Sequence, residues 1–301
     1  MQSNSSDAPA STAGATQTPA SASAEATGRA PGSADHAWPE FGYEVMPFKG
    51  IFESVTASVP TDVPLTVTAS PNKTIEDTVK LAVRFHADGY RVAPHLSARM
   101  IRNRDHLGEL LTDLQTGGIR ELFVIGGDAE PPAGDYVDAL GLLRDIASFD
   151  LAWDRIGIGG YPEGHPKIDD AKLLQALVAK QPFATHIVTQ ICFSAEATAT
   201  WLRQLRAAGV TLPVRIGVPG AIERTKLIRI SSSVGVGESM NFLRKQQSMF
   251  WRFFVPGGYN PTKLVKAYRK HFSAPDVEGF HIFTFNSVKS TEEWRRKMNS
   301  H

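Results

Sequence analysis

The chain has 301 residues, of which 42% are hydrophobic, 21% charged and 9% aromatic, a composition typical of a globular protein and not of a fibrous or wholly disordered one. Its 32 basic and 31 acidic side chains leave a formal net charge of +1, which gives no electrostatic indication of nucleic acid or an anionic membrane as a partner. The single cysteine, Cys192, excludes an internal disulfide framework and a cysteine-based zinc site, and no apolar run approaches the ~18–20 residues that span a bilayer.

Residues 1–37 differ in composition from the rest of the chain. Ala, Ser, Thr, Pro and Gly supply 27 of the first 36 residues, and Met1 is the only large apolar side chain among them. Such a segment cannot offset its chain entropy by burying apolar surface, so we expect a disordered tail that precedes one domain of residues 38–301. The tail has neither the basic start nor the apolar centre of a secretory signal, so a cytoplasmic location is expected.

From Trp38 onward, short runs of β-branched and aromatic residues alternate with amphipathic stretches. Eight of these runs predict strands, because each is short and is bounded by polar or glycine-containing segments. The predicted strands span residues 41–45, 65–68, 90–93, 122–125, 156–159, 186–189, 214–217 and 280–284.

The amphipathic stretches between most of these strands predict helices, because their apolar residues recur every three or four positions. A further helix is predicted to begin at Asn260 and Pro261, an N-cap followed by a first helical residue. The predicted apolar faces consist of Ile75, Val79, Ala82 and Phe85; of Leu107, Leu110, Leu111 and Leu114; of Ala139, Leu140, Leu143 and Ile146; and of Trp201, Leu202 and Leu205.

Regular alternation of eight strands with helices predicts an α/β fold, a single-domain (β/α)8 or TIM barrel. The alternative is an open doubly wound sheet, which normally carries a G-x-G-x-x-G turn after its first strand. Residues 47–50 read Pro-Phe-Lys-Gly, which does not match that turn and therefore favours the barrel.

Polar groups stand at the carboxyl ends of seven of the eight predicted strands. In (β/α)8 barrels the active site lies at this end of the strands, so a ring of polar side chains there indicates a site. The ring consists of Glu44, Thr68, His95, Asp128, residues 161–166, Thr189 with Gln190, and Thr284 with Asn286.

These segments, in this order, resemble the methylenetetrahydrofolate reductase family from about Phe41 to Asn286. The most specific match is the Tyr-Pro-Glu-Gly-His-Pro run at residues 161–166, which carries the family's Tyr-Pro-Glu-x-His-Pro pattern in full. The other matches are Glu44 with Pro47, Pro94-His95, Gly127-Asp128 followed by Pro131-Pro132, and Thr189-Gln190.

The resemblance implies an enzyme that reduces 5,10-methylenetetrahydrofolate to 5-methyltetrahydrofolate with hydride from NADH or NADPH, usually through bound FAD. The reaction opens a five-membered ring by protonating a nitrogen, and the matching position implies that Glu44 is the general acid. Neither the histidines nor the carboxylates have metal-ligand spacing, so no metal is expected. By the same resemblance, Asp128 and Gln190 bind the pterin of the folate substrate, and the flavin-lining positions are Thr68, His95, Tyr161 and His165.

The chain departs from the family at positions that hold FAD. Gly126 stands where the family has an arginine, and Val178 and Ala179 stand where it has a basic pair, with Lys172 and Lys180 nearby but out of register. Each lost cation removes a charge-assisted hydrogen bond of roughly 1.5–3 kcal/mol to the FAD diphosphate. This loss resembles the flavin-independent, mycobacterial-type branch of the family, in which the nicotinamide gives hydride directly to the folate, so FAD is not expected.

Two other functions remain open: an FAD-dependent reductase that holds its flavin by other contacts, and a non-catalytic folate-binding barrel. The site residues also have structural alternatives, with Glu44 as a rim ion pair, Asp128 as a turn cap, and His95 and His165 as structural histidines. The sequence leaves the oligomeric state undetermined, and residues 235–237, Gly-Val-Gly, are either a phosphate-binding loop or an ordinary connection.

Overall fold

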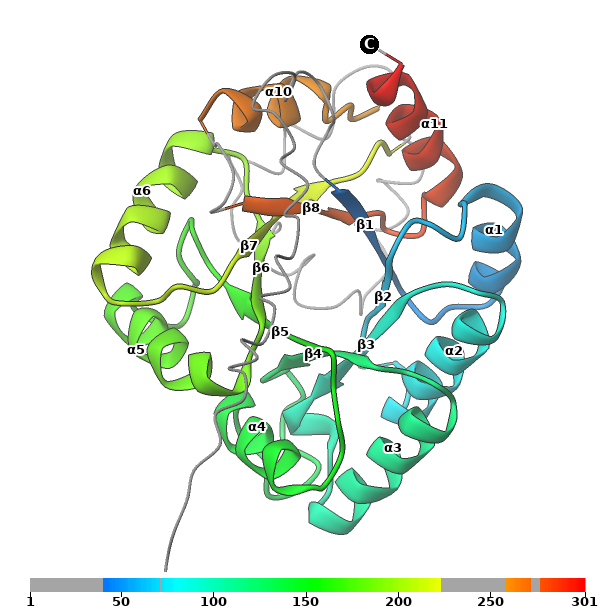
Figure 1. Cartoon of the computed structure of the whole chain (residues 1–301), viewed down its shortest axis with the longest axis vertical. Helices are drawn as coiled ribbons and strands as arrows, with labels where there is room; N and C mark the ends of the chain where they lie inside the picture. Colours follow the sequence, from blue (N-terminus) through cyan, green and yellow to red (C-terminus); the bar gives the residue numbers. More distant parts are fainter. Residues whose placement is uncertain (1–39, 71, 223–257, 272–276, 301) are drawn as a thin grey trace, which may run out of the picture. The chain divides into compact units, whose positions relative to one another are not determined.

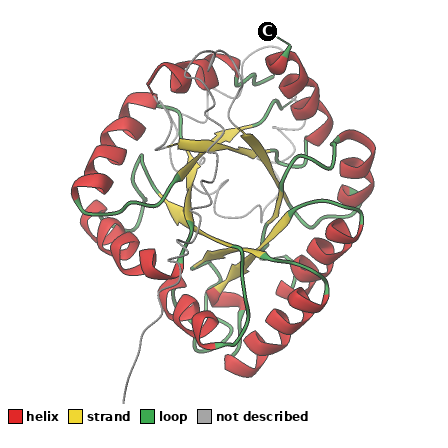
Figure 2. Cartoon of the chain, viewed as in Figure 1, coloured by secondary structure: helices red, strands yellow, loops and turns green. Residues whose placement is uncertain are grey.

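Eight parallel strands form a closed barrel in the order in which they occur along the chain (Figures 1 and 2). Strand β1 (Glu40–Val45) closes the ring by pairing with β8 (Val277–Phe283), which confirms the predicted (β/α)8 fold. The predicted tail and the Gly-Val-Gly segment lie outside the described residues. This computed structural model describes residues 40–70, 72–222, 258–271 and 277–300.

Every predicted strand has an observed counterpart, although the strand ends are shifted. The third prediction was displaced: that strand ends at Ser97, so His95 lies within the strand and not in the loop after it. The physical reason is that the sequence around Pro94 pairs with the next strand through residues 95–97. The remaining strands are β2 (Leu65–Val67), β3 (Val92–Ser97), β4 (Glu121–Ile125), β5 (Arg155–Gly160), β6 (His186–Ile191) and β7 (Val214–Pro219).

Helices form an outer layer around the strands (Figure 2). Two short 3-10 turns, Ala98–Met100 and Gln181–Phe183, follow β3 and the helix that ends at Lys180. The helices are α1 (Ile51–Ser58), α2 (Ile75–Ala87), α3 (Arg104–Thr116), α4 (Ala139–Ser148), α5 (Asp170–Lys180), α6 (Ala195–Ala207), α10 (Thr262–His271) and α11 (Val288–Asn299).

Local sequence explains where these helices begin and which face they bury. Thr74 and Asp77 form a capping box at the start of α2, whose predicted apolar face is buried. In α4 the predicted face was wrong at one position, because Leu142 is buried with Leu143 while Leu140 is only half-buried. Leu140 instead lines a cavity beside the barrel, which is described below.

A layer of alternating charges closes the amino-terminal end of the barrel. Arg215 is only 6% exposed and lies 2.7 Å from Glu40, and Arg155 lies 2.5 Å from Glu278. Arg91 joins the same layer through Glu40, at 2.7 Å. Because each buried charge has an opposite partner, this end is sealed by ion pairs and the carboxyl end is left for a site.

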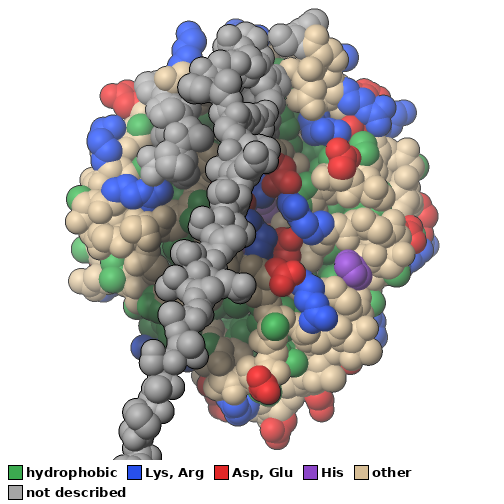
Figure 3. All heavy atoms as spheres, viewed as in Figure 1, with side chains coloured by type: hydrophobic (Ala, Val, Ile, Leu, Met, Phe, Trp, Pro, Cys, Tyr) green, Lys and Arg blue, Asp and Glu red, His purple; other side chains and the backbone are tan. Residues whose placement is uncertain are grey.

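On the face that Figure 3 shows, basic and acidic side chains lie interspersed over the described part of the barrel. Among the helices that the structure describes, none combines the length and the apolar character required to cross a bilayer.

Candidate active site

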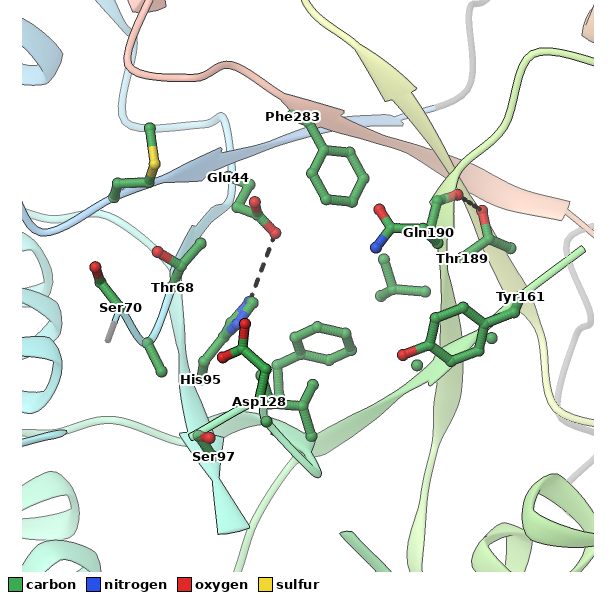
Figure 4. A pocket seen from close by; sticks show the side chains of 18 of the residues that line it. Glu44, Thr68, Ser70, His95, Ser97, Asp128, Tyr161, Thr189, Gln190 and Phe283 are labelled. Atoms are coloured by element: carbon green, nitrogen blue, oxygen red, sulfur yellow. Dashed lines mark hydrogen bonds and ion pairs between the residues drawn. The ribbon is translucent and has the colours of Figure 1, made fainter. Parts of the chain in front are cut away.

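A cavity opens at the carboxyl end of the barrel strands, and six of the seven predicted site residues line it (Figure 4). They come from six successive strands or the loops that follow them, so the closed barrel brings together residues far apart in sequence. The walls between them are largely apolar and include Phe123, Ile125 and Phe283. The six predicted residues are Glu44, Thr68, His95, Asp128, Tyr161 and Gln190.

Glu44 is buried and faces two histidines instead of a rim cation. Its Oε2 lies 3.2 Å from Nε2 of His281 and 3.7 Å from Nε2 of His95. The three residues are 8%, 3% and 6% exposed, respectively. Among the residues that the structure describes, Glu44 has no lysine or arginine within ion-pair distance, so the rim ion-pair alternative does not describe it.

His95 lies in β3 with its ring edge-on to Phe123, at a centroid separation of 4.6 Å. Burial holds the pKa of His95 well below 6.5, and the positive charge that His281 can carry lowers it further. His95 is therefore neutral near pH 7. Its Nε2 is buried and has no hydrogen-bond partner in the described structure, which leaves a polar atom available at the cavity wall.

The end of β8 holds the backbone of Glu44 in place. Thr284 donates a hydrogen bond of 2.6 Å from Oγ1 to the carbonyl oxygen of Glu44. Asn286 accepts from the backbone nitrogen of Met46 and donates to its carbonyl oxygen, at 2.8 and 3.0 Å. Phe285 and Asn286 have φ of 48° and 58°, a left-handed conformation that is costly for residues other than glycine.

Asp128 extends into the cavity from the loop after β4 (Figure 4). The preceding Gly127 has a φ of 82°, and a Cβ there would overlap Oγ of Ser97, so only glycine allows this loop to approach β3. Arg99 fixes the loop by donating from its backbone to Gly126 and from Nε to Ala129, at 3.0 and 2.8 Å. The loop therefore presents the Asp128 carboxylate, which is exposed, to the open side of the cavity.

Gln190 reaches the cavity because β6 is irregular. The pairing of β6 with β7 shifts register between Val188 and Ile191. As a result, three consecutive residues, Val188, Thr189 and Gln190, line the cavity, whereas a regular strand would turn every second one away. The amide of Gln190 points into the same space as Glu44 and Asp128 (Figure 4).

The Tyr-Pro-Glu-Gly-His-Pro run forms the loop after β5, and its members lie in two places. Tyr161 lines the central cavity, and the ring of His165 meets it edge-on at 5.0 Å. Oε1 of Glu163 accepts hydrogen bonds from the backbone nitrogens of Phe193 and Ser194, at 2.7 and 2.6 Å, and so ties this loop to the start of α6.

A second cavity, called here the side cavity, has a volume of about 590 Å³ and adjoins the central one. His165, the seventh predicted residue, lines the side cavity and not the central one. The two cavities share Gly127, Asp128, Tyr161 and Gln190, so one extended ligand can occupy both. From α5 the side cavity receives Leu173, Ala176 and Lys180, and not Val178 or Ala179.

Cys192 is fully buried beside β6, and burial raises the pKa of its thiol to about 12. It is therefore a thiol at neutral pH and no nucleophile. Within the described ranges, no three His, Cys, Asp or Glu side chains group as metal ligands.

His281, Phe283 and Phe285 also belong to the site, although no site role was predicted for them. The first of these occupies an inward-facing position of β8, two residues before Phe283, and the register of β8 against β1 brings it beside Glu44. The sequence signal for a site role of His281 was a polar residue between the aromatic residues Phe280 and Phe283 of a predicted strand. The register that places it against Glu44 cannot be read from the sequence.

Comparisons with known proteins identify a family. A family model described as methylenetetrahydrofolate reductase matches residues 27–237. The 5,10-methylenetetrahydrofolate reductase of Salmonella typhimurium is 29% identical over 136 residues, which cover 43% of this chain and 44% of that protein. Methylenetetrahydrofolate reductase 2 of Saccharomyces cerevisiae is 24% identical over 198 residues, which cover 61% of this chain and 32% of that protein. The matches thus span less than half the length of these curated relatives.

Proposed function

The chain belongs to the methylenetetrahydrofolate reductase family, and we propose that it reduces 5,10-methylenetetrahydrofolate to 5-methyltetrahydrofolate by direct hydride transfer from NADH or NADPH. The observation that carries this proposal is the position of Glu44, a buried carboxyl group that faces the cavity and has histidines instead of guanidinium groups as partners.

In the proposed reaction, Glu44 donates its proton to a ring nitrogen of the folate. The bond from that nitrogen to the methylene carbon breaks, and the carbon becomes an iminium that accepts hydride. The two histidines approach Oε2, so Oε1 is the carboxyl oxygen that the described contacts leave for the substrate nitrogen. Solvent then returns the proton to Glu44.

Asp128 and Gln190 are the proposed pterin-binding residues. The pterin offers hydrogen-bond donors that suit a carboxylate, and a mixed donor and acceptor edge that suits a primary amide. Both side chains point into the cavity that Glu44 faces (Figure 4), which supports a pterin held with its reacting carbon toward that acid.

The nicotinamide is proposed to lie near Thr68, His95 and Tyr161, which line the same cavity. Direct transfer requires the donor and acceptor carbons to be roughly 3–3.5 Å apart, so both substrates must be bound together. His165 is proposed to contact the coenzyme farther out, in the side cavity.

At the positions where the family resemblance puts cations for the FAD diphosphate, this chain brings none to the side cavity, which supports a reaction without flavin. Gly126 brings no cation to the side cavity, and Val178 is 42% exposed and lies outside it. FAD supplies hydride storage in the enzymes that bind it, and no step of the proposed reaction passes through it here.

The test uses purified full-length protein with methylenetetrahydrofolate and either NADH or NADPH, with and without added FAD. We expect a colourless protein that oxidises the nicotinamide only when folate is present, at a rate that added FAD does not change. A yellow protein with stoichiometric flavin, or a rate that depends on FAD, would establish the FAD-dependent alternative. Folate binding without oxidation of either coenzyme would establish the non-catalytic one.

A further inference from the structure

The side cavity contains a basic group whose partner is absent from the described structure. Lys180, the last residue of α5, lines this cavity and has no ion pair or hydrogen bond there. Two other cations line the cavity. Arg99 is already paired with Glu130 at 2.6 Å, and Lys167, in the loop after β5, is exposed to solvent. Burial lowers the pKa of Lys180 to about 8, and the negative charge of Asp138 opposes this shift only in part. Lys180 is therefore mostly protonated at neutral pH.

A half-buried ammonium group with no ion-pair or hydrogen-bond partner among the described residues is costly, and an anionic ligand would remove that cost. The cavity volume of about 590 Å³ falls within the range of sites that hold organic ligands. The anion is therefore expected to belong to a larger molecule and not to a free small ion.

The walls of the side cavity also offer apolar surface. Only three large hydrophobic side chains among the described residues are strongly exposed, and two of them, Val137 at 59% and Ile168 at 42%, line this cavity. Leu140 and Leu173 extend the apolar surface. Exposed apolar side chains beside a cation suit a flat base attached to a phosphate.

We infer that the side cavity binds the adenosine diphosphate moiety of NADH or NADPH, with Lys180 on the diphosphate and Val137 and Ile168 against the adenine. This inference rests on the proposed function, because the nicotinamide end must then reach the central cavity. The carboxylate of Asp138, at the start of α4, is placed on the same wall and is the acceptor that ribose hydroxyl groups require.

The path between the cavities is open for such a dinucleotide. Gly126 lines the side cavity, and a Cβ there would meet no atom nearer than 3.9 Å. The adjoining Gly127 lines both cavities. The absence of side chains at these two positions leaves a passage from Lys180 toward Tyr161 and the proposed nicotinamide position.

The experiment compares the wild type with Lys180→Met and with a matched control, Lys172→Met. Lys172 lies on the same helix but is exposed and pairs with Asp169 at 3.4 Å. Two quantities are measured: the dissociation constant of ADP-ribose by calorimetry, which needs no turnover, and the steady-state constants with both substrates. Lys180→Met should raise the ADP-ribose dissociation constant and the KM for the nicotinamide coenzyme about tenfold or more, without changing the KM for folate. The control should change neither.

Several results would overturn the inference. ADP-ribose could fail to bind the wild type, or it could bind Lys180→Met as tightly as the wild type. The Lys172→Met control could also lose as much ADP-ribose affinity as Lys180→Met. Circular dichroism of Lys180→Met shows whether the variant is folded, so that a loss of binding caused by unfolding is not read as a loss of the site.

A fluorescence titration with FAD separates the two possible sources of the ADP moiety. Tight FAD binding that Lys180→Met abolishes would assign the cavity to the flavin and overturn the inference. If ADP-ribose binding depends on Lys180 but the protein does not turn over folate, the binding site is supported and only the proposed reaction is wrong.

Discussion

Glu44 differs from the other carboxylates inside the barrel in the partners it contacts. Glu40 and Glu278 lie against arginines at 2.7 and 2.5 Å, and a guanidinium group stays charged at every accessible pH. Glu44 contacts His281 and His95 instead, and burial keeps His95 uncharged near neutral pH. These contacts are compatible with the proposed role of Glu44 as a proton donor, because they place no permanently charged guanidinium group beside it.

Replacement of Glu44 by glutamine should remove most of the turnover while leaving folate binding largely intact. The amide keeps the size of the side chain and its hydrogen-bonding capacity but has no proton to donate. General acid catalysis contributes roughly a hundredfold to ten-thousandfold, so kcat should fall by that factor and KM should change little. Steady-state rates and a folate titration measure the two quantities. A variant with near-normal kcat would show that another group protonates the substrate.

His281 is expected to act as a positioning residue for Glu44, through the contact of 3.2 Å to Oε2. His281→Leu should lower kcat by about tenfold to a hundredfold, because a displaced acid no longer meets the substrate nitrogen. His281→Gln keeps a donor near the same place and should recover part of the loss, while the KM for folate stays constant in both.

A matched control for this prediction is His106→Gln. His106 is also a buried histidine that pairs with a glutamate, Glu76, at 3.0 Å, but it lies on α3 in the outer layer. It should change stability without a selective loss of kcat. Equal activities of His281→Leu and His281→Gln would argue against a positioning role.

At the scale of elements, α11 is anchored to β1 through a buried carboxylate. Glu292 is 2% exposed and accepts a hydrogen bond of 2.8 Å from the hydroxyl group of Tyr43. Arg295 and Arg296 bind its two oxygens at 2.8 to 2.9 Å. Although burial acts to raise the pKa of Glu292, these hydrogen bonds lower it below 4.5. Strand β1 carries Glu44, so this helix supports the strand that carries the proposed general acid.

Glu292→Gln should destabilise the protein by roughly 2 kcal/mol at pH 7, which corresponds to several degrees in Tm. The folded pKa is below the unfolded one, so the stabilisation is complete above the unfolded pKa of about 4.5 and is lost as pH falls through the folded value. The difference in Tm between wild type and variant should therefore shrink as the pH falls below about 4.5 and toward the lower folded pKa. Glu293→Gln, an exposed neighbour on α11, is the control and should leave Tm unchanged at all pH values.

The strands also show which parts of the fold can be predicted from the sequence. Periodicity located all eight strands, because short apolar runs bounded by turns are typical of strands buried in a parallel sheet. The predicted position of β3 was wrong, because the end of a strand depends on its pairing with the neighbouring strand. Proline is also unusual inside a strand, so Pro94 suggested that the strand ended before it. The irregular pairing that turns Gln190 inward and the left-handed turn at Phe285 are set by tertiary contacts, and local propensity carries no signal for them.

At the scale of the whole molecule, the two ends of the barrel have different roles. Ion pairs around Arg215 close the amino-terminal end, and the predicted site residues gather at the other. The choice of end was predictable from the fold alone, because loops at the carboxyl ends of barrel strands are free to vary. The partnership of Glu44 with His281 was not, because it joins residues 237 positions apart through the closure of β8 onto β1.

In the proposed reaction, hydride passes directly from the nicotinamide to the folate while Glu44 supplies the proton. Without a flavin there is no place to store the hydride, so both substrates must occupy the adjoining cavities before either product leaves. The most direct test is the initial-rate pattern against one substrate at several fixed concentrations of the other, together with the absorbance of the nicotinamide when enzyme is mixed with it before folate is added. We expect intersecting lines and no oxidation until folate arrives. Parallel lines, or oxidation of NADH or NADPH by the enzyme alone, would contradict direct transfer.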